Sequence, residues 1–442
     1  MYKLAPSPGG DEVRLSDPYA PPASDITGDH ATRTALAIAP AVLLAGVAGG
    51  IAFPILPAVG AEAGLPLWFI GLILAANRAA RVVSNPFVGT LSDRLGGRRV
   101  LIVGMGIQLV VMALYVLGVT TGHPGAFFLI GRLLHGPGSS AVFVSAQALA
   151  LHAGGRAHGG RAASTVRIAI GIGIPFGVVV GGVLADVWST ARTFEAAMFA
   201  LAAATVAAVA LVPDLRVSSR RSPKLRDAVA ALRDPRLAAV GALNFAVNFS
   251  ASGMILTTLV LLVRERHLSL GGFGDKGTSG VLMGGMVIVD AVATAVFGPL
   301  GDRRQTHARI AAAGLAVLVV ALVAVGHAGT AAGVVGGLVL VGIGAGALGP
   351  SLLALVGKLV APERMGTGIG VMQLCGDVGG MLGPLVGTSL FAQSTQTPYL
   401  VSAALLACGL PVAVWLTRQP LEGVPAGAGE RVAAKLGVAE ED

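Results

Sequence analysis

Long apolar runs, separated by short charged or glycine- and proline-rich segments, dominate this sequence. A helix that crosses a membrane needs about 20 consecutive apolar residues, and twelve such runs can be marked along the chain. We place them near residues 33–58, 67–91, 99–120, 125–148, 164–187, 191–213, 237–262, 278–300, 307–327, 331–357, 366–392 and 398–418. The pattern predicts an all-α integral membrane protein with twelve transmembrane helices.

The twelve runs fall into two sets of six. We expect a disordered cytoplasmic tail, a six-helix bundle, a charged cytoplasmic linker, a second six-helix bundle and a second cytoplasmic tail. Their predicted ranges are 1–32, 33–213, 214–236, 237–418 and 419–442. The linker is rich in arginine, which is typical of a solvated connection.

Composition supports a membrane protein. Of the 442 residues, 54% are hydrophobic and only 12% are charged, against about 25% charged in soluble domains. The net charge of +8 comes from short clusters between apolar runs, so nucleic acid is not an expected partner. Cys375 and Cys408 have neither the spacing of a metal site nor that of a disulfide framework. We therefore expect no metal and no cofactor.

The basic residues also predict the topology. If the N-terminus is cytoplasmic, 24 of the 31 Lys and Arg residues fall on the cytoplasmic side. Basic residues accumulate on that side in membrane proteins. We expect a multi-pass protein of the cell membrane with both termini in the cytoplasm.

An internal repeat relates the two halves at an offset of 209 residues. Gly89, Asp93 and Arg94 then align with Gly298, Asp302 and Arg303. The same offset aligns two further residues of the first half, Gly171 and Pro175, with Gly380 and Pro384. Parallel six-helix repeats are a transporter architecture, in which the substrate lies between the halves near the middle of the membrane.

The segment that begins Gly89-Thr-Leu-Ser-Asp93-Arg94 and continues to Arg98 resembles the signature loop of the major facilitator superfamily. The resemblance implies two pseudo-symmetric six-helix bundles that work by alternating access, normally as a monomer. It also implies gating roles for this loop and its second copy. The gating residues are Gly89, Asp93, Arg94, Arg98, Asp302 and Arg303.

Two further stretches resemble motifs of that superfamily. Arg132 and Gly136 match an R-x-x-x-G motif that is associated with proton coupling. Gly383 and Pro384 belong to a G-x-x-x-G-P-x-x-G pattern of exporters, which here occurs in span eleven. The resemblance favours a proton antiporter, although close helix packing explains the glycines equally well.

Charged residues inside the spans are expensive, so each needs a partner or a wet cavity. In the superfamily, span two packs beside span eleven. Arg81 lies 12 residues above Asp93 and Asp377 lies 11 residues above Gly366, heights of about 18 and 17 Å. We therefore expect Arg81 and Asp377 to form an interhelix pair, with Arg78 also within reach. This pair could equally be a permanent structural salt bridge.

The remaining polar residues of the spans are candidates for substrate and proton binding. Substrate candidates are Arg78, Arg132, Asn244, Asn248 and Gln373. Proton-coupling candidates are Asp290, Asp377 and His135. A lone histidine such as His135 is as often a packing residue as a proton carrier.

Two functions fit these residues. The first is proton-coupled export of a small drug or metabolite across the cell membrane. The second is uptake or flipping of an organic anion or lipid headgroup, because three arginines against two acids leave a positive surplus in the spans. An enzyme is not expected, because the sequence has no metal-ligand spacing, phosphate loop or nucleophile triad. The expected partners are a small solute, protons and the lipid bilayer.

Overall fold

The computed structural model describes residues 28–213, 230–360 and 365–419. Most of each predicted tail and most of the predicted linker lie outside the described residues. Residues 28–32, which we predicted to belong to a disordered tail, are instead the start of helix α1. The helices follow in chain order, with η1 a π-helix. They are α1 (Gly28–Glu62), α2 (Leu67–Leu95), α3 (Gly97–Thr120), α4 (Pro124–Val187), α5 (Thr190–Leu211), α7 (Pro235–Val247), η1 (Asn248–Ile255), α8 (Leu256–Glu265), α9 (Asp275–Arg304), α10 (His307–His327), α11 (Ala331–Leu359), α12 (Met365–Phe391) and α13 (Thr397–Thr417).

Among these residues, 12 helical segments are long and apolar enough to cross a membrane. All twelve predicted spans are therefore confirmed. Helices satisfy every backbone hydrogen bond internally, which lipid requires. The element α4 contains two spans, Pro124–Ala153 and Ala162–Val187, whereas α7, η1 and α8 together form one, Pro235–Glu265.

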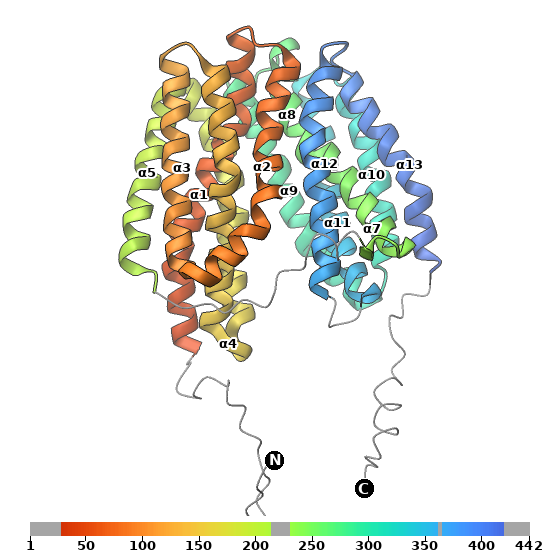
Figure 1. The fold of residues 1–442 in the computed structure, drawn as a ribbon. Coiled ribbons are helices and arrows are strands. Elements are labelled where there is room, and N and C mark those ends of the chain that lie inside the picture. The colour runs from red at the N-terminus through yellow and green to blue at the C-terminus, as the bar shows by residue number, and fades with distance from the viewer. Residues whose placement is uncertain (1–27, 214–229, 361–364, 420–442) are drawn as a thin grey trace, which may run out of the picture.

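The spans form two bundles (Figure 1), and each bundle has a large core of its own. One large cluster of buried apolar side chains draws all its members from α1 to α5 and the residue that follows, including Met112, Phe128 and Leu201. The other is built almost wholly from α7 to α13, including Leu259, Leu322 and Leu406. We call the two halves the N-bundle and the C-bundle.

The turn after span two repeats in the C-bundle. Gly96 joins α2 to α3 at φ +89°, a conformation that glycine adopts without steric cost. Gln305, which follows α9, is its equivalent at the offset of 209 residues and is also left-handed, at φ +51°. The backbone of the repeat is thus kept although the glycine is not.

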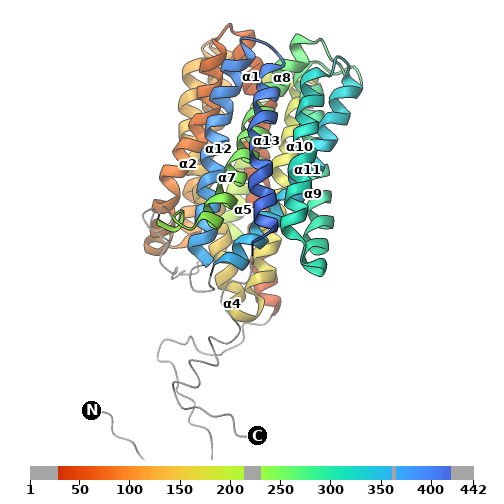
Figure 2. The ribbon, with the colours of Figure 1, turned by 90° about the vertical axis from the view of Figure 1, so that its right-hand side faces the viewer.

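The bundles meet at one end of the molecule and part at the other. We call the end at which α1 begins and α13 ends the terminal side, and the opposite end the far side (Figures 1 and 2). On the far half of the seam between α4 and α9, a Cβ on Gly182 would lie 3.0 Å from the Gly280 Cα. Towards the terminal side, Ile172 and Ile288 are 54% and 58% exposed.

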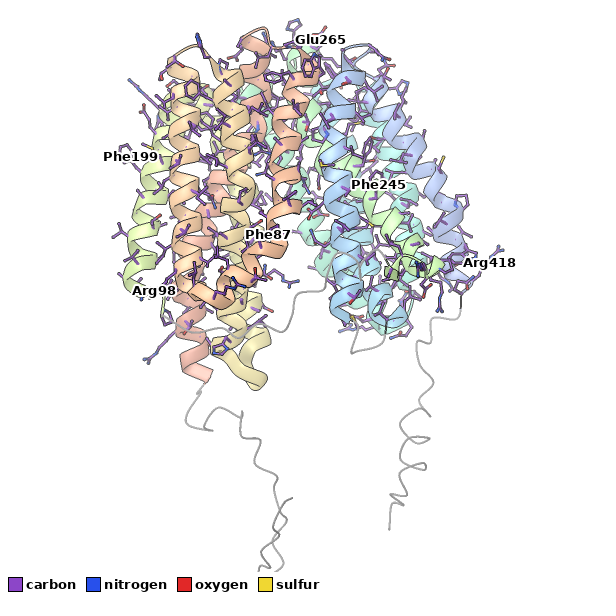
Figure 3. All side chains as sticks on the ribbon, in the orientation of Figure 1. Phe87, Arg98, Phe199, Phe245, Glu265 and Arg418 are labelled. Atoms are coloured by element: carbon purple, nitrogen blue, oxygen red, sulfur yellow. The ribbon has the colours of Figure 1, made fainter. Side chains whose placement is uncertain are left out.

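The seam between α2 and α12 opens in the same direction. On its far half, a Cβ on Gly71 would collide with the Thr388 hydroxyl. On the terminal half of α2, Phe87 is 68% exposed, and Figure 3 shows it on the stretch of α2 that bends away from the C-bundle. Both seams are therefore closed on the far side and open towards the terminal side.

Glycine at position 50 allows α1 to approach α4, and this contact generates a stability prediction. A Cβ on Gly50 would collide with the Ile174 carbonyl oxygen. We expect Gly50→Ala to destabilise the N-bundle by about 1 to 3 kcal/mol, the usual cost of overpacking. Thermal unfolding of the detergent-purified protein measures the change.

The matched control is Gly106→Ala in α3, because nothing lies within 4 Å of a Cβ at that position. Alanine there should be neutral or stabilise the helix by up to about 1 kcal/mol. Equal melting temperatures for the two variants would contradict the packing argument.

Candidate functional site

The Asp377 carboxylate lies between two arginines of span two. Its Oδ1 is 2.5 Å from Arg81 Nη2 and 3.6 Å from Arg78 Nη1. The Arg78 side chain occupies space beside Gly380, where a Cβ would lie 2.6 Å from the guanidinium Cζ. The structure thus brings together Arg81 and Asp377, which the sequence placed at one height, and Arg78, which it placed within reach.

This cluster lies where the seam between α2 and α12 opens. The Asp377 side chain is only 4% exposed, whereas the Arg78 and Arg81 side chains are 20% and 26% exposed. The two guanidinium groups are therefore accessible to solvent, whereas the carboxylate that they contact is not. Because they share one acid, the cluster keeps a positive charge.

Arg132 lies deeper, in span four of the N-bundle. It is 3% exposed and donates from Nη2 to the Leu74 carbonyl at 3.3 Å. Its guanidinium stands 5.7 Å from the centroid of the Phe53 ring, and its Nε lacks a hydrogen-bond partner. Among the described residues no carboxylate pairs with it. A buried cation without a counter-charge is costly.

His135 is buried and tied to span two. The Asn77 side-chain amide lies 2.5 Å from His135 Nδ1, so the amide donates to an unprotonated ring nitrogen. Ser140 donates to Asn85 Oδ1 at 2.6 Å two turns further along the same pair of helices. These contacts give His135 a role in joining α2 to α4. Sequence reasoning missed Asn77, although it directly precedes Arg78.

In span seven, Asn244 lies one turn before the π-helix and Asn248 is the first residue of the π-helix. Asn244 donates to the Met372 carbonyl of α12 at 2.7 Å, and Asn248 donates to the Asn244 carbonyl at 2.9 Å. Gln373, the next residue of α12, is exposed. Asn244 therefore links α7 to α12, Asn248 bonds within its own span, and Gln373 is the most accessible of the three.

Asp290 lies in α9, at the repeat equivalent of Arg81. Its side chain is partly buried, and it makes no ion pair or hydrogen bond with any residue that the structure describes. Arg81 in the N-bundle and Asp290 in the C-bundle therefore occupy equivalent positions of the repeat and carry opposite charges.

The predicted gating residues lie on the terminal side. Gly89 is partly exposed, Arg94 is exposed, and Arg98 donates to the Val209 carbonyl of α5. The Asp93 side chain lies outside the described part of the chain. In the second copy, Arg303 is exposed and Asp302 Oδ1 lies 2.9 Å from His307 Nε2.

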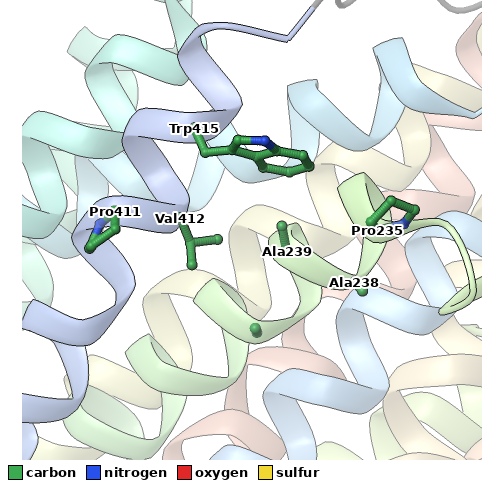
Figure 4. A pocket seen from close by; sticks show the side chains of 7 residues that line it. Pro235, Ala238, Ala239, Pro411, Val412 and Trp415 are labelled. Carbon is green, nitrogen blue, oxygen red and sulfur yellow. The ribbon is translucent and has the colours of Figure 1, made fainter.

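An apolar groove of about 530 Å³ lies between α7 and α13, away from these residues (Figure 4). Ala239, Val412 and Trp415 are among the side chains that line it. None of the predicted site residues does so. Among the described residues, no group of three or more His, Cys, Asp or Glu side chains is arranged to hold a metal ion.

Twelve spans in two repeated bundles, with charges at the seam between them, define a multi-pass membrane transport protein. The family model of the Major Facilitator Superfamily matches residues 38–384 and 270–438. The chain belongs to this family, whose members are transporters rather than enzymes.

Relatives in bacteria cover most of the chain. It is 27% identical to "Multidrug resistance protein MdtG" of Escherichia fergusonii, over 82% of this chain and 89% of that protein. It is 24% identical to "Uncharacterized MFS-type transporter YhhS" of Escherichia coli K12, over 83% of this chain and 87% of that protein.

Solved structures share the fold. The nucleoside transporter NupG matches with a TM-score of 0.74 and 14% identity, over 88% of this chain and all of NupG. The human organic anion transporter MFSD10 matches with a TM-score of 0.62 and 20% identity, over 87% of this chain and 99% of that chain.

The cluster around Asp377 generates a double-mutant prediction. Arg81→Ala leaves Arg78 as a second partner for the carboxylate, so we expect it to cost less than Asp377→Ala, which strands two cations. Breaking a buried pair costs about 3 to 5 kcal/mol, whereas removing both charges is much cheaper. The double variant should therefore be more stable than the sum of the single variants, measured by thermal unfolding. Strict additivity would contradict a direct interaction.

Variants at the contact between Asn77 and His135 test whether His135 is a structural residue or a proton carrier. We expect His135→Gln and Asn77→Leu each to lower the melting temperature, because each removes a buried hydrogen bond worth about 1 kcal/mol. The pH dependence of transport should be unchanged in His135→Gln. A shifted pH profile in that variant with normal stability would make His135 a proton carrier.

Proposed function

We propose that this protein exports a small organic anion across the cell membrane by alternating access, in exchange for protons. The observation that carries the proposal is the uncompensated positive charge of the N-bundle. Arg132 has no carboxylate partner among the described residues, and Arg78 and Arg81 share Asp377. An anionic group on the substrate would supply the missing counter-charge.

The three arginines would act at different stages. Arg78 and Arg81 are partly exposed towards the open terminal side, so they would receive the anion first. Arg132 lies next to Phe53, so an aromatic or apolar body could pack there while the charge meets the guanidinium. Asn248 and Gln373 offer hydrogen bonds from the C-bundle. A solute bound in this way would contact both halves, as alternating access requires.

The direction of transport rests on two supports. The excess of Lys and Arg in the terminal-side segments favours a cytoplasmic terminal side, so the open face would accept a cytoplasmic solute. The printed name of MdtG describes drug resistance, which fits export. On the terminal side, the loop with Gly89, Arg94 and Arg98 and its copy with Asp302 and Arg303 would close the cytoplasmic entrance during the cycle, together with Asp93.

Asp290 is our proposed proton site. It is a partly buried acid without a described counterion, on the bundle opposite the arginines. Protonation would remove its charge while the protein returns without substrate. Asp377 is less suited, because its carboxylate is already engaged by Arg81 and Arg78.

The arginine assignment can be tested with a panel of labelled anionic, neutral and cationic solutes in proteoliposomes. We expect Arg132→Gln to reduce transport of the anionic solute by about tenfold or more, because loss of a charge-assisted contact costs about 1.5 to 3 kcal/mol. Arg192→Gln is the control, since Arg192 is exposed on the far side. Unchanged anion transport in Arg132→Gln would refute the assignment.

A second candidate function is export of a cationic drug, with Asp290 as the partner of the cation. The variant Asp290→Asn distinguishes this function from export of an anion in exchange for protons. If Asp290 carries the proton, the variant should lose accumulation driven by an acidic vesicle lumen but keep exchange of anion for anion. If Asp290 instead binds a cationic substrate, both accumulation and exchange of the cation should be lost.

A further inference from the structure

Helix α9 begins on the far side without a capping side chain of its own. Its N-cap residue is Gly274, and no side-chain cap bond is made by that residue. The first turn of any helix presents backbone N–H groups that need acceptors. Here one of them is satisfied from the other bundle: the Gly277 N–H donates to Asp186 Oδ2 at 2.6 Å.

Asp186 is suited to this position by charge and by space. It lies near the end of α4 in the N-bundle, and a carboxylate is favourable at the positive end of a helix dipole. A Cβ on Gly274 would lie 3.1 Å from Asp186 Oδ2, and one on Gly277 would lie 2.7 Å from it. Glycine at both positions therefore lets the carboxylate approach.

A salt bridge stands beside this cap. Lys276 Nζ lies 2.9 Å from Glu62 Oε1 at the end of α1, and 3.3 Å from the Thr190 hydroxyl at the start of α5. The lysine side chain is only 13% exposed. Three helices of the N-bundle thus contact the first turn of one helix of the C-bundle.

We propose that Asp186, Glu62 and Lys276 form an outer gate, which closes the far side in this conformation and comes apart when that side opens. Every contact of the gate joins one bundle to the other. When the far ends separate, α9 loses its acceptor and Lys276 loses its carboxylate. The proposal requires alternating access but neither the anionic substrate nor the proton site.

The gate would favour the far-side-closed state by a measurable factor. Loss of an N-cap costs about 1 kcal/mol, which is about a fivefold change in an equilibrium. The ratio of far-side-open to far-side-closed molecules should therefore rise about fivefold when Asp186 can no longer cap α9. Loss of the neighbouring salt bridge should shift the ratio in the same direction.

Distances between spin labels on the far side measure this ratio without any substrate. The labels would be attached to Thr121→Cys in the N-bundle and Gln393→Cys in the C-bundle, both exposed, after Cys375 and Cys408 have been changed to Ser. We expect Asp186→Ala and Lys276→Glu each to increase the long-distance population. Adding Glu62→Lys to Lys276→Glu should restore the original distribution.

Glu265→Gln is the matched control, because Glu265 is an exposed acid on the far side of the C-bundle (Figure 3). It should leave the distances unchanged. Asp186→Asn keeps an acceptor oxygen and should give a smaller shift, and it replaces Asp186→Ala if that variant does not fold. Unchanged distances in Lys276→Glu and the Asp186 variant would overturn the gate. Failure of the charge swap to restore the distribution would overturn the direct pairing.

Discussion

The structure depends on how it neutralises charge inside the membrane. Asp377 is almost fully buried and accepts two guanidinium groups, which makes the contact between α2 and α12 electrostatic as well as steric. Because the arginines outnumber the acid, neutralisation is incomplete in this conformation. The same arrangement therefore joins the two bundles at this seam and leaves there the positive charge on which our proposal of an anionic solute rests.

The parts of the fold that depend on one helix at a time could be predicted from the sequence. The twelve spans follow from apolar run lengths, and the meeting of Arg81 with Asp377 follows from counting residues to a common height in two helices that the superfamily resemblance places side by side. The repeat offset also makes Asp290 the equivalent of Arg81 in the second half.

Contacts that depend on helix rotation or on loop ends could not be predicted in this way. Asn77 reaches His135 only because the two helices face each other with particular azimuths, which periodicity alone does not define. Asp186 caps a helix 91 residues further along the chain, and no local pattern signals an acceptor supplied by another bundle. Lys276 pairs with Glu62, which lies 214 residues away, so no local pattern signals this contact either.

The π-helix in span seven has a consequence for the geometry of the C-bundle. A π-turn holds more residues than an α-turn, so the segment after Ile255 is rotated relative to a continuous α-helix. This rotation lets Asn244 face α12 while Thr258 meets the Tyr399 hydroxyl of α13 at 3.1 Å. Span seven thus contacts α12 and α13 through faces that point in different directions. Deleting a single residue from the π-helix would rotate one of these faces away from its neighbour, so the number of residues in this span is constrained.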